Sequence, residues 1–162
     1  MRAFIVGCGR VGAGLAERLA RAGHDVTIVD ITAESFGRLE PDFPGRALRG
    51  DGTDEDVLRR AGAEGADVFF ALTEGDNRNI LTAQLAAESL SVPRVVAKIN
   101  DPVRAEAYAA LGIATLCRTL LLVDALAVYS GLPSDPSVGG VSLPTGHHPG
   151  GDHEPAAVPA EA

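Results

Sequence analysis

Three glycines near the start of the chain, Gly7, Gly9 and Gly12, have the spacing of a turn that can hold a diphosphate. They follow the apolar run 4–6 and open a stretch with helical periodicity. In such a turn the first glycine permits a tight bend, and the second lets a diphosphate approach the backbone. The third lets the helix pack closely on the strand. The helix N-terminus then offers free N–H groups and a positive potential to phosphate. The sequence therefore predicts a phosphate-binding turn over 7–12.

A carboxylate, Asp30, ends the next apolar run and belongs to the same pattern of strand, turn, helix, strand and acid. In this position a carboxylate accepts hydrogen bonds from ribose hydroxyls; the alternative interpretation is a solvated aspartate at a strand end. A carboxylate that binds ribose would repel a 2′-phosphate, and the neighbouring Ile31 and Thr32 offer no arginine to receive one. NADP is therefore disfavoured. NAD(H), ATP and ADP share the same adenosine ribose. The sequence therefore predicts NAD(H) or ATP/ADP as the ligand and leaves these open.

Polar residues at the ends of later predicted strands extend this candidate site. Asp51 and Gly52 lie where an adenine edge would be held, although a simple turn is an alternative. Thr73 follows the fourth strand, and its hydroxyl could reach phosphate or ribose, or could only cap the next helix. Lys98 ends the fifth strand and could offset phosphate charge. Arg10 could reach phosphate or stack on adenine. Either cation could also be an ordinary surface residue.

The predicted binding residues are these positions and their neighbours in the chain: Gly7, Cys8, Gly9, Arg10, Val11, Gly12, Asp30, Ile31, Asp51, Gly52, Thr73, Glu74 and Lys98. The sequence predicts no catalytic residue. The Tyr-x-x-x-Lys pair of short-chain dehydrogenases is missing, because Gly112 stands four residues after Tyr108. His24 precedes the second predicted strand, at the end of the sheet opposite the candidate site. We also predict no resident metal ion.

Strand-like and helix-like segments alternate along the chain, which predicts parallel strands with right-handed helical crossovers. The predicted strands are 3–6, 26–29, 46–49, 67–72, 94–98 and 113–116. The predicted helices are 11–22, 31–39, 54–61, 77–90, 102–111 and 119–130, with Thr53 and Asp101 as caps of two of them. We therefore expect an α/β fold with a Rossmann-like, doubly wound sheet of six parallel strands and helices on both faces. Its ligand crevice would lie outside the carboxyl ends of the strands, where every candidate residue falls.

Composition excludes several other classes of protein. The 162 residues carry a formal charge of −8 and contain no Lys/Arg cluster, so the sequence predicts no nucleic-acid partner. Two isolated cysteines indicate a reducing compartment without disulfides. The stretch 113–132 is apolar, but Arg118 and Asp124 interrupt it, and we expect no direct membrane insertion. Together with a start that lacks a signal-peptide pattern, this predicts a cytoplasmic protein.

The chain divides into three segments by composition. Residues 1–118 carry the alternating elements, and 119–130 read as a Leu-rich helix within a segment 119–131. From 132 onward there are six of the ten prolines and no Lys or Arg, with little apolar periodicity. Because such a segment buries too little surface to offset its ordering entropy, 132–162 is expected to be a disordered tail.

The combined pattern resembles the nucleotide-binding domain of TrkA/KtrA-type bacterial potassium-uptake regulators, the RCK or KTN domain. The resemblance rests on the stretches 4–12, 23–30, 50–53, 71–79 and 95–102, continuing into 111–113, and it covers 1–131. Members bind NAD(H) or ATP/ADP with positions that match Gly7, Gly9, Arg10, Val11, Asp30, Asp51, Thr73 and Lys98 here.

The resemblance implies a regulatory subunit without enzymatic activity. Such proteins bind a membrane potassium translocator of the Trk/Ktr type at the inner face of the cell membrane and are otherwise cytoplasmic. They form homodimers through the helix matching 119–130 and assemble into rings, and the bound nucleotide changes the ring's shape and the gate. Many members carry a further C-terminal ligand-sensing domain, whose place the Pro/Gly-rich segment takes here, so we expect that domain to be missing. The alternatives are a small NAD-dependent oxidoreductase and a nucleotide-sensing module for another membrane or signalling partner.

Overall fold

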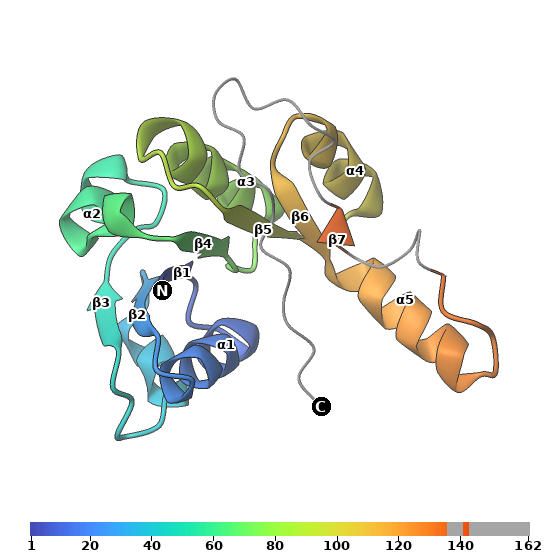
Figure 1. Cartoon of the computed structure of the whole chain (residues 1–162), viewed down its shortest axis with the longest axis horizontal. Coiled ribbons are helices and arrows are strands. Elements are labelled where there is room, and N and C mark those ends of the chain that lie inside the picture. Colours follow the sequence, from blue (N-terminus) through green and yellow to red (C-terminus); the bar gives the residue numbers. More distant parts are fainter. Residues whose placement is uncertain (136–140, 143–162) are drawn as a thin grey trace.

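Six parallel strands form the centre of the structure, as the sequence predicts (Figure 1). The computed structural model describes residues 1–135 and 141–142, and within them the strand order is β3-β2-β1-β4-β5-β6-β7. The strands are β1 Arg2–Val6, β2 Asp25–Asp30, β3 Arg46–Arg49, β4 Val68–Ala71, β5 Val95–Ile99, β6 Ala114–Cys117 and β7 Val141–Ser142. After β3 the chain returns to the other side of β1, so the order reverses between β1 and β4. This is the doubly wound arrangement of a Rossmann-like fold.

The structure adds a short strand, β7, to the six strands that the sequence predicts. It pairs antiparallel with β6, with Leu116 opposite Val141 and Thr115 opposite Ser142. The composition of 132–162 predicts disorder. A strand of only two residues, Val141 and Ser142, is too short to show the alternating pattern from which a strand can be predicted. The outer edge of β6 nevertheless presents unpaired backbone groups that an extended segment can satisfy. Residues 136–140 and 143–162 of the predicted tail lie outside the described residues.

Helices cover both faces of the sheet. They are α1 Arg10–Arg21, the 3₁₀ turn η1 Ala33–Arg38, α2 Glu55–Ala61, the 3₁₀ turn η2 Ala63–Gly65, α3 Asp76–Gln84, the π-helical turn η3 Leu85–Ser89, α4 Pro102–Ala110 and α5 Arg118–Tyr129. Alternate residues of each strand point to opposite faces. Ala3 and Ile5 of β1 therefore belong to a cluster with residues of α1 and η1, whereas Phe4 and Val6 belong to a larger cluster that also contains residues of α2, α3 and α4.

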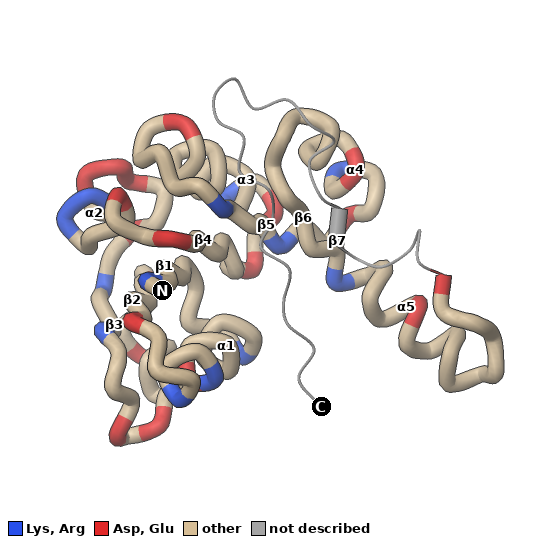
Figure 2. The backbone as a smooth tube through the Cα atoms, in the orientation of Figure 1, with Lys and Arg blue, Asp and Glu red and all other residues tan. Residues whose placement is uncertain are grey.

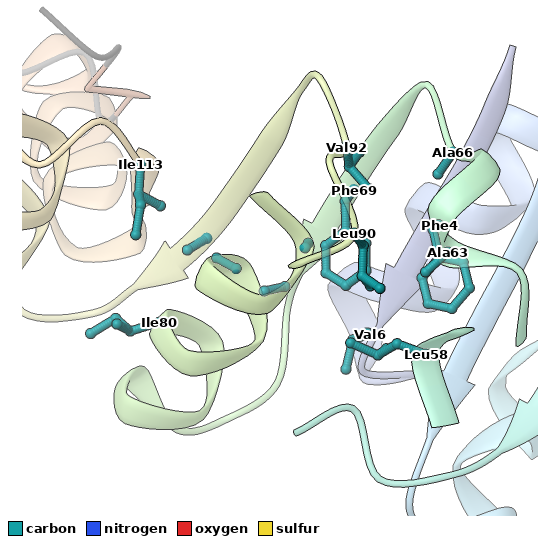
Figure 3. Packing of buried hydrophobic residues seen from close by; sticks show 14 of the residues in the cluster. Phe4, Val6, Leu58, Ala63, Ala66, Phe69, Ile80, Leu90, Val92 and Ile113 are labelled. Atoms are coloured by element: carbon teal, nitrogen blue, oxygen red, sulfur yellow. The ribbon is translucent and has the colours of Figure 1, made fainter. Parts of the chain in front are cut away.

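Small and branched side chains fill these two cores, as the low aromatic content of the sequence suggests. Figure 3 shows part of the larger cluster, in which Leu58 of α2 lies close to Val6 of β1. The aromatic centre is a stacked pair, Phe4 and Phe69, whose ring centroids are 5.2 Å apart. Tight packing on both faces holds β1 and β4 rigidly side by side, and their carboxyl ends form the site described below.

The predicted caps have different outcomes. Asp101 accepts two backbone N–H bonds from the first turn of α4, which begins at Pro102, so this cap is confirmed. The prediction for Thr53 is wrong, because Asp54 accepts the N–H bonds at the start of α2. The Thr53 hydroxyl instead donates to Asp51, 2.8 Å away. The predicted helix 77–90 corresponds to α3 followed by the π-helical turn η3.

The last helix, α5, extends away from the sheet (Figure 1) and has no buried residue. Arg118 and Asp124 are its charged residues, and most of its length is uncharged (Figure 2). Leu122, Leu126 and Tyr129 are 58%, 65% and 93% exposed. Cover within the described residues is confined to other positions of the helix: Leu120 packs against the larger core cluster, and Asp124 accepts hydrogen bonds from Ser134 and Asp135. Within 1–135 and 141–142, no helix is both long and apolar enough to cross a bilayer.

Candidate functional site

A cleft of about 240 Å³ lies at the carboxyl ends of the central strands. It opens at the position where the strand order reverses, which is where doubly wound folds bind their ligands. Its lining comes from the segments that follow β1, β2, β3 and β4. The lining residues are Val6, Gly7, Gly9, Asp30, Ile31, Thr32, Ser35, Arg38, Gly50, Asp51, Gly52, Leu72, Thr73, Glu74 and Arg78.

Two of the three motif glycines are required by the fold itself. Gly7 has φ of +106°, and a Cβ there would lie 2.8 Å from the carbonyl carbon of Leu72 and the nitrogen of Thr73. Gly12 lies against the carbonyl oxygen of Gly7, which a Cβ on Gly12 would overlap. These positions therefore let the turn pack on β4 and let α1 pack on the turn, and they say nothing by themselves about a ligand.

The middle glycine differs. Gly9 has a negative φ of −77°, and a Cβ there would meet its nearest neighbour, Oε1 of Glu74, at 3.8 Å. That is an ordinary van der Waals distance, so no contact within the described chain requires glycine at position 9. Gly9 is also the N-cap of α1, without a side-chain cap and without an acidic residue in the first turn. An open turn at an uncompensated helix N-terminus suits an incoming oxyanion.

Asp30 joins the end of β2 to this turn. Its Oδ2 accepts the backbone N–H of Cys8 at 2.7 Å, and its Oδ1 accepts that of Thr32 at 2.8 Å. An ionised carboxylate offers about four acceptor positions, so about two remain after these bonds. They are available to the two hydroxyls of a ribose in the cleft.

Asp51 supplies a second carboxylate on the β3 side of the cleft. Hydrogen bonds from the backbone and then the hydroxyl of Thr53 lower its pKa, with a smaller contribution from the nearby Arg78 guanidinium. Gly52 next to it packs against Val6 so closely that a Cβ would overlap that side chain. The carbonyl of Gly52 accepts the Thr82 hydroxyl of α3 at 3.0 Å. The Asp51 carboxyl is thus ionised at neutral pH, and its loop is anchored to α3 and packed against β1.

A buried amide, Asn79, fixes the loop after β4. Its Oδ1 accepts both the backbone N–H and the hydroxyl of Thr73, at 2.8 and 2.7 Å. Its Nδ2 donates to the carbonyls of Thr73 and Lys98, at 3.0 and 2.8 Å. Asn79 therefore links the ends of β4 and β5. Because the Thr73 hydroxyl donates to Asn79, in this arrangement it can accept a bond from a ribose hydroxyl and cannot donate one to phosphate.

With the site described, its relationship to known proteins can be stated. The sequence profile of the TrkA-N domain matches residues 3–119. The chain belongs to the TrkA-N domain family.

Curated relatives agree with this assignment. The chain is 46% identical over 124 residues to a Trk system potassium uptake protein TrkA of Streptomyces coelicolor, covering 76% of this chain and 56% of the relative. It is 37% identical over 102 residues to the protein of the same name from Vibrio alginolyticus, covering 63% of this chain and 22% of that one. The chain thus spans about half, or less, of these relatives.

Solved structures share the fold at lower identity. The TrkA-N domain of the Escherichia coli inner membrane protein ybaL has a TM-score of 0.70 at 16% identity, covering 79% of this chain and 95% of that one. The Kef C-terminal domain of Shewanella denitrificans, in an AMP-bound form, has a TM-score of 0.69 at 22% identity over 80% of this chain and 79% of that one. The GsuK channel bound to NAD has a TM-score of 0.63 at 19% identity over 76% of this chain and 22% of the channel.

Eight of the predicted binding residues line the cleft of this TrkA-N domain: Gly7, Gly9, Asp30, Ile31, Asp51, Gly52, Thr73 and Glu74. The other five do not line it. Cys8 and Gly12 are buried within the turn, and Arg10 and Val11 are exposed on the first turn of α1. Lys98 is only 3% exposed, and its ammonium nitrogen lies 4.0 Å from Glu74 in the loop after β4.

The cleft also contains residues that the sequence pattern does not single out. Thr32, Ser35 and Arg38 come from the segment after β2, and Arg78 lies in the first turn of α3. Arg38 matters most, because it brings a cation to the same cleft as Asp30. One of the two arguments against a 2′-phosphate, the lack of a nearby arginine, is therefore weakened; repulsion by Asp30 remains. The periodicity of 31–39 predicts an α-helix and gives no sign that Arg38, at the end of the 3₁₀ turn η1, lines the cleft.

Cys8 is a shielded thiol. Burial, followed by the neighbouring charge of Asp30, raises its pKa from 9.0 to about 11. Its Sγ donates to the carbonyl of Ser35, 3.4 Å away. The helix N-terminus therefore does not produce a thiolate here at neutral pH, and redox activity at Cys8 is disfavoured.

We predict that Gly9 and Gly12 respond differently to alanine. Gly9→Ala should leave the midpoint of urea unfolding close to that of the unaltered chain, since the added Cβ has room. It should weaken nucleotide binding at least tenfold, because the methyl occupies the path of the diphosphate. Gly12→Ala should destabilise the fold by about 3 kcal/mol or more through overlap with the Gly7 carbonyl. Equal loss of stability in both variants would contradict this division of roles.

The raised pKa of Cys8 predicts a loss of stability at high pH. A folded-state pKa above the unfolded value means that only the unfolded chain gains from ionisation as the pH passes 9, so this contribution is present below pH 9 and is lost towards pH 11. The difference in unfolding free energy between the unaltered chain and Cys8→Ala, measured in urea, should therefore be constant below pH 9 and decrease above it. A difference that does not vary with pH would show that the thiol ionises as readily in the folded chain.

Proposed function

We propose that this chain is a regulatory nucleotide-binding subunit of a potassium uptake system. In this proposal it binds NAD(H) or ATP/ADP and gates a separate Trk/Ktr-type membrane translocator. It would therefore act in the cytoplasm, at the inner face of the membrane through its partner. The observation that carries the proposal is the open turn at Gly9 beside the partly unsatisfied carboxylate of Asp30. The names of the Streptomyces and Vibrio relatives support the link to potassium uptake.

The same geometry indicates how the ligand would be held. The diphosphate would lie against the amides of the turn at Gly9, and Asp30 would accept bonds from the adenosine ribose. Asp51 and Gly52 would hold the adenine edge. NAD and AMP are the ligands named for the GsuK and Kef structures, which supports an adenine nucleotide in this fold. Residues 10, 11 and 98 stay predictions as ligand contacts, since they do not line the cleft.

We propose regulation rather than catalysis. The described cleft lining contains no histidine, the side chain that most often moves protons in enzymes. A ligand can drive a gate without any reaction, provided that two shapes of the protein bind it with different free energies. A tenfold preference for one shape corresponds to about 1.4 kcal/mol. Turnover of NADH with carbonyl compounds would instead identify an oxidoreductase.

Calorimetric titration with NAD, NADH, ATP and ADP tests the ligand. We expect saturable binding of at least one of these compounds and no consumption of NADH. Asp30→Ala should weaken binding about tenfold, the loss of one or two hydrogen bonds to ribose. Asp42→Ala, which removes an exposed carboxylate away from the cleft, is the matched control. Because Asp30 also supports the turn, the melting temperature of each unliganded variant shows whether the fold is intact. Binding that is unchanged in a folded Asp30→Ala variant would remove Asp30 from the site.

We further propose that α5 mediates a homodimer, with rings built from such dimers. Leu122, Leu126 and Tyr129 recur at helical spacing on its surface and are 58%, 65% and 93% exposed. Leu126→Glu should therefore convert a dimer to a monomer in size-exclusion chromatography with light scattering. Leu111→Glu is the matched control, because Leu111 is 73% exposed on another part of the fold. A monomeric unaltered chain, or dissociation by both variants, would contradict an α5 interface.

A further inference from the structure

One oxygen atom of the chain lies between two groups that would attract a phosphate. Oε1 of Glu74 is 4.0 Å from the ammonium nitrogen of Lys98. The same Oε1 is the atom nearest to a Cβ built on Gly9, at 3.8 Å. The carboxylate thus extends from the loop after β4 to the turn at the N-terminus of α1. It holds a negative charge beside both the open turn and a buried cation.

The two partners of this ion pair differ in freedom. The Lys98 side chain is 4% exposed and fixed at the end of β5, whereas the Glu74 side chain is 87% exposed. An exposed side chain can rotate into solvent at little cost, but a buried ammonium needs a nearby negative charge. Lys98 therefore stays in place, and Glu74 is the partner that another anion can replace.

The fold determines which part of a ligand reaches this pair. Asp30 on the β2 side would hold the adenosine ribose, and the cleft crosses the reversal of strand order between β1 and β4. A nucleotide anchored at Asp30 therefore directs its far end towards Thr73 and Glu74. In ATP that end is a chain of negatively charged phosphates. In NAD⁺ it is a second ribose with a positively charged nicotinamide ring.

We propose that Glu74 is the residue that determines ligand specificity at this site, and that it acts by competing with phosphate for Lys98. This inference rests on the proposed nucleotide site and assigns it a selectivity. The Glu74 carboxylate must leave when a terminal phosphate arrives, and its charge opposes each further negative charge on the ligand. It interacts favourably with a cationic nicotinamide. The site should therefore favour NAD⁺ over a nucleoside triphosphate.

The rest of the cleft strengthens this effect. Among its lining residues Asp30, Asp51 and Glu74 are acidic, and Arg38 and Arg78 are basic. Removing the one charge at Glu74 would change the balance of the lining from net negative to neutral. A single exposed carboxylate can thus decide which ligands are accepted.

Titration calorimetry on Glu74→Gln, with ATP and NAD⁺ as the two probes, tests the proposal. The amide keeps the size of the side chain and removes its charge. At low salt the affinity for ATP should rise about tenfold, as expected for relief of repulsion between charges about 4 Å apart in a wet site, while that for NAD⁺ should stay level or fall. The gain for ATP should shrink at high salt, because exposed charges are screened. Glu88→Gln changes net charge equally at an exposed position away from the cleft, and it should alter neither affinity.

Two failures can be told apart. If the unaltered chain binds neither ATP nor NAD⁺, the proposed nucleotide site is wrong, and this inference is wrong with it. The role of Glu74 alone would be overturned by a different result. In that result the unaltered chain binds a nucleotide and Asp30→Ala weakens this binding, but Glu74→Gln binds ATP no more tightly than the unaltered chain. Weaker ATP binding by Glu74→Gln would also overturn it, since it would show that the carboxylate helps to hold the triphosphate.

Discussion

The contact of backbone with backbone where the glycine turn meets the end of β4 is the constraint on which the site depends. Gly7 lies against the peptide that joins Leu72 to Thr73, and Gly12 lies against the carbonyl of Gly7. No side chain fits between these segments, so β1, the start of α1 and β4 are held together at a fixed distance. The cleft is the space left beside this contact. Its shape is therefore set by packing that a ligand does not have to create.

Polar contacts then connect the loops around this rigid centre. Asp30 ties the end of β2 to the turn, Thr82 ties the loop after β3 to α3, and Asn79 ties the loop after β4 to β5. Each contact joins segments that are distant in sequence, and Thr82 and Asn79 are fully buried. Buried hydrogen bonds of this kind are costly to leave unmade, so the loops have few alternative positions. The polar groups of the cleft are thus held in place without a ligand.

The sequence predicts the fold well because the fold depends on local patterns: glycine spacing, buried apolar strands and helical periodicity. It also places Gly9 and Asp30 in one cleft, since a parallel sheet collects the ends of its strands at one edge. It misses what depends on tertiary contacts. Arg38 of η1 lines the cleft, and Lys98 at the end of β5 is buried, and neither outcome follows from a local pattern. Asn79 resembles an ordinary residue of a first helical turn until its partners are known.

A weakly charged cleft built around open amides has a consequence for regulation. The affinity for a diphosphate would come mainly from fixed N–H groups, which any adenine nucleotide can use, whereas discrimination would come from the few charges at the far end. A regulator needs such a division, since a ligand shifts an equilibrium only by its difference in affinity between two shapes. If α5 joins two copies, β5 and β6 connect the loop after β4 with that interface. The strands pair directly, with Lys98 of β5 opposite Leu116 of β6, and α5 begins one residue after β6 ends. Only two paired strands therefore separate the Glu74 end of the cleft from the exposed helix.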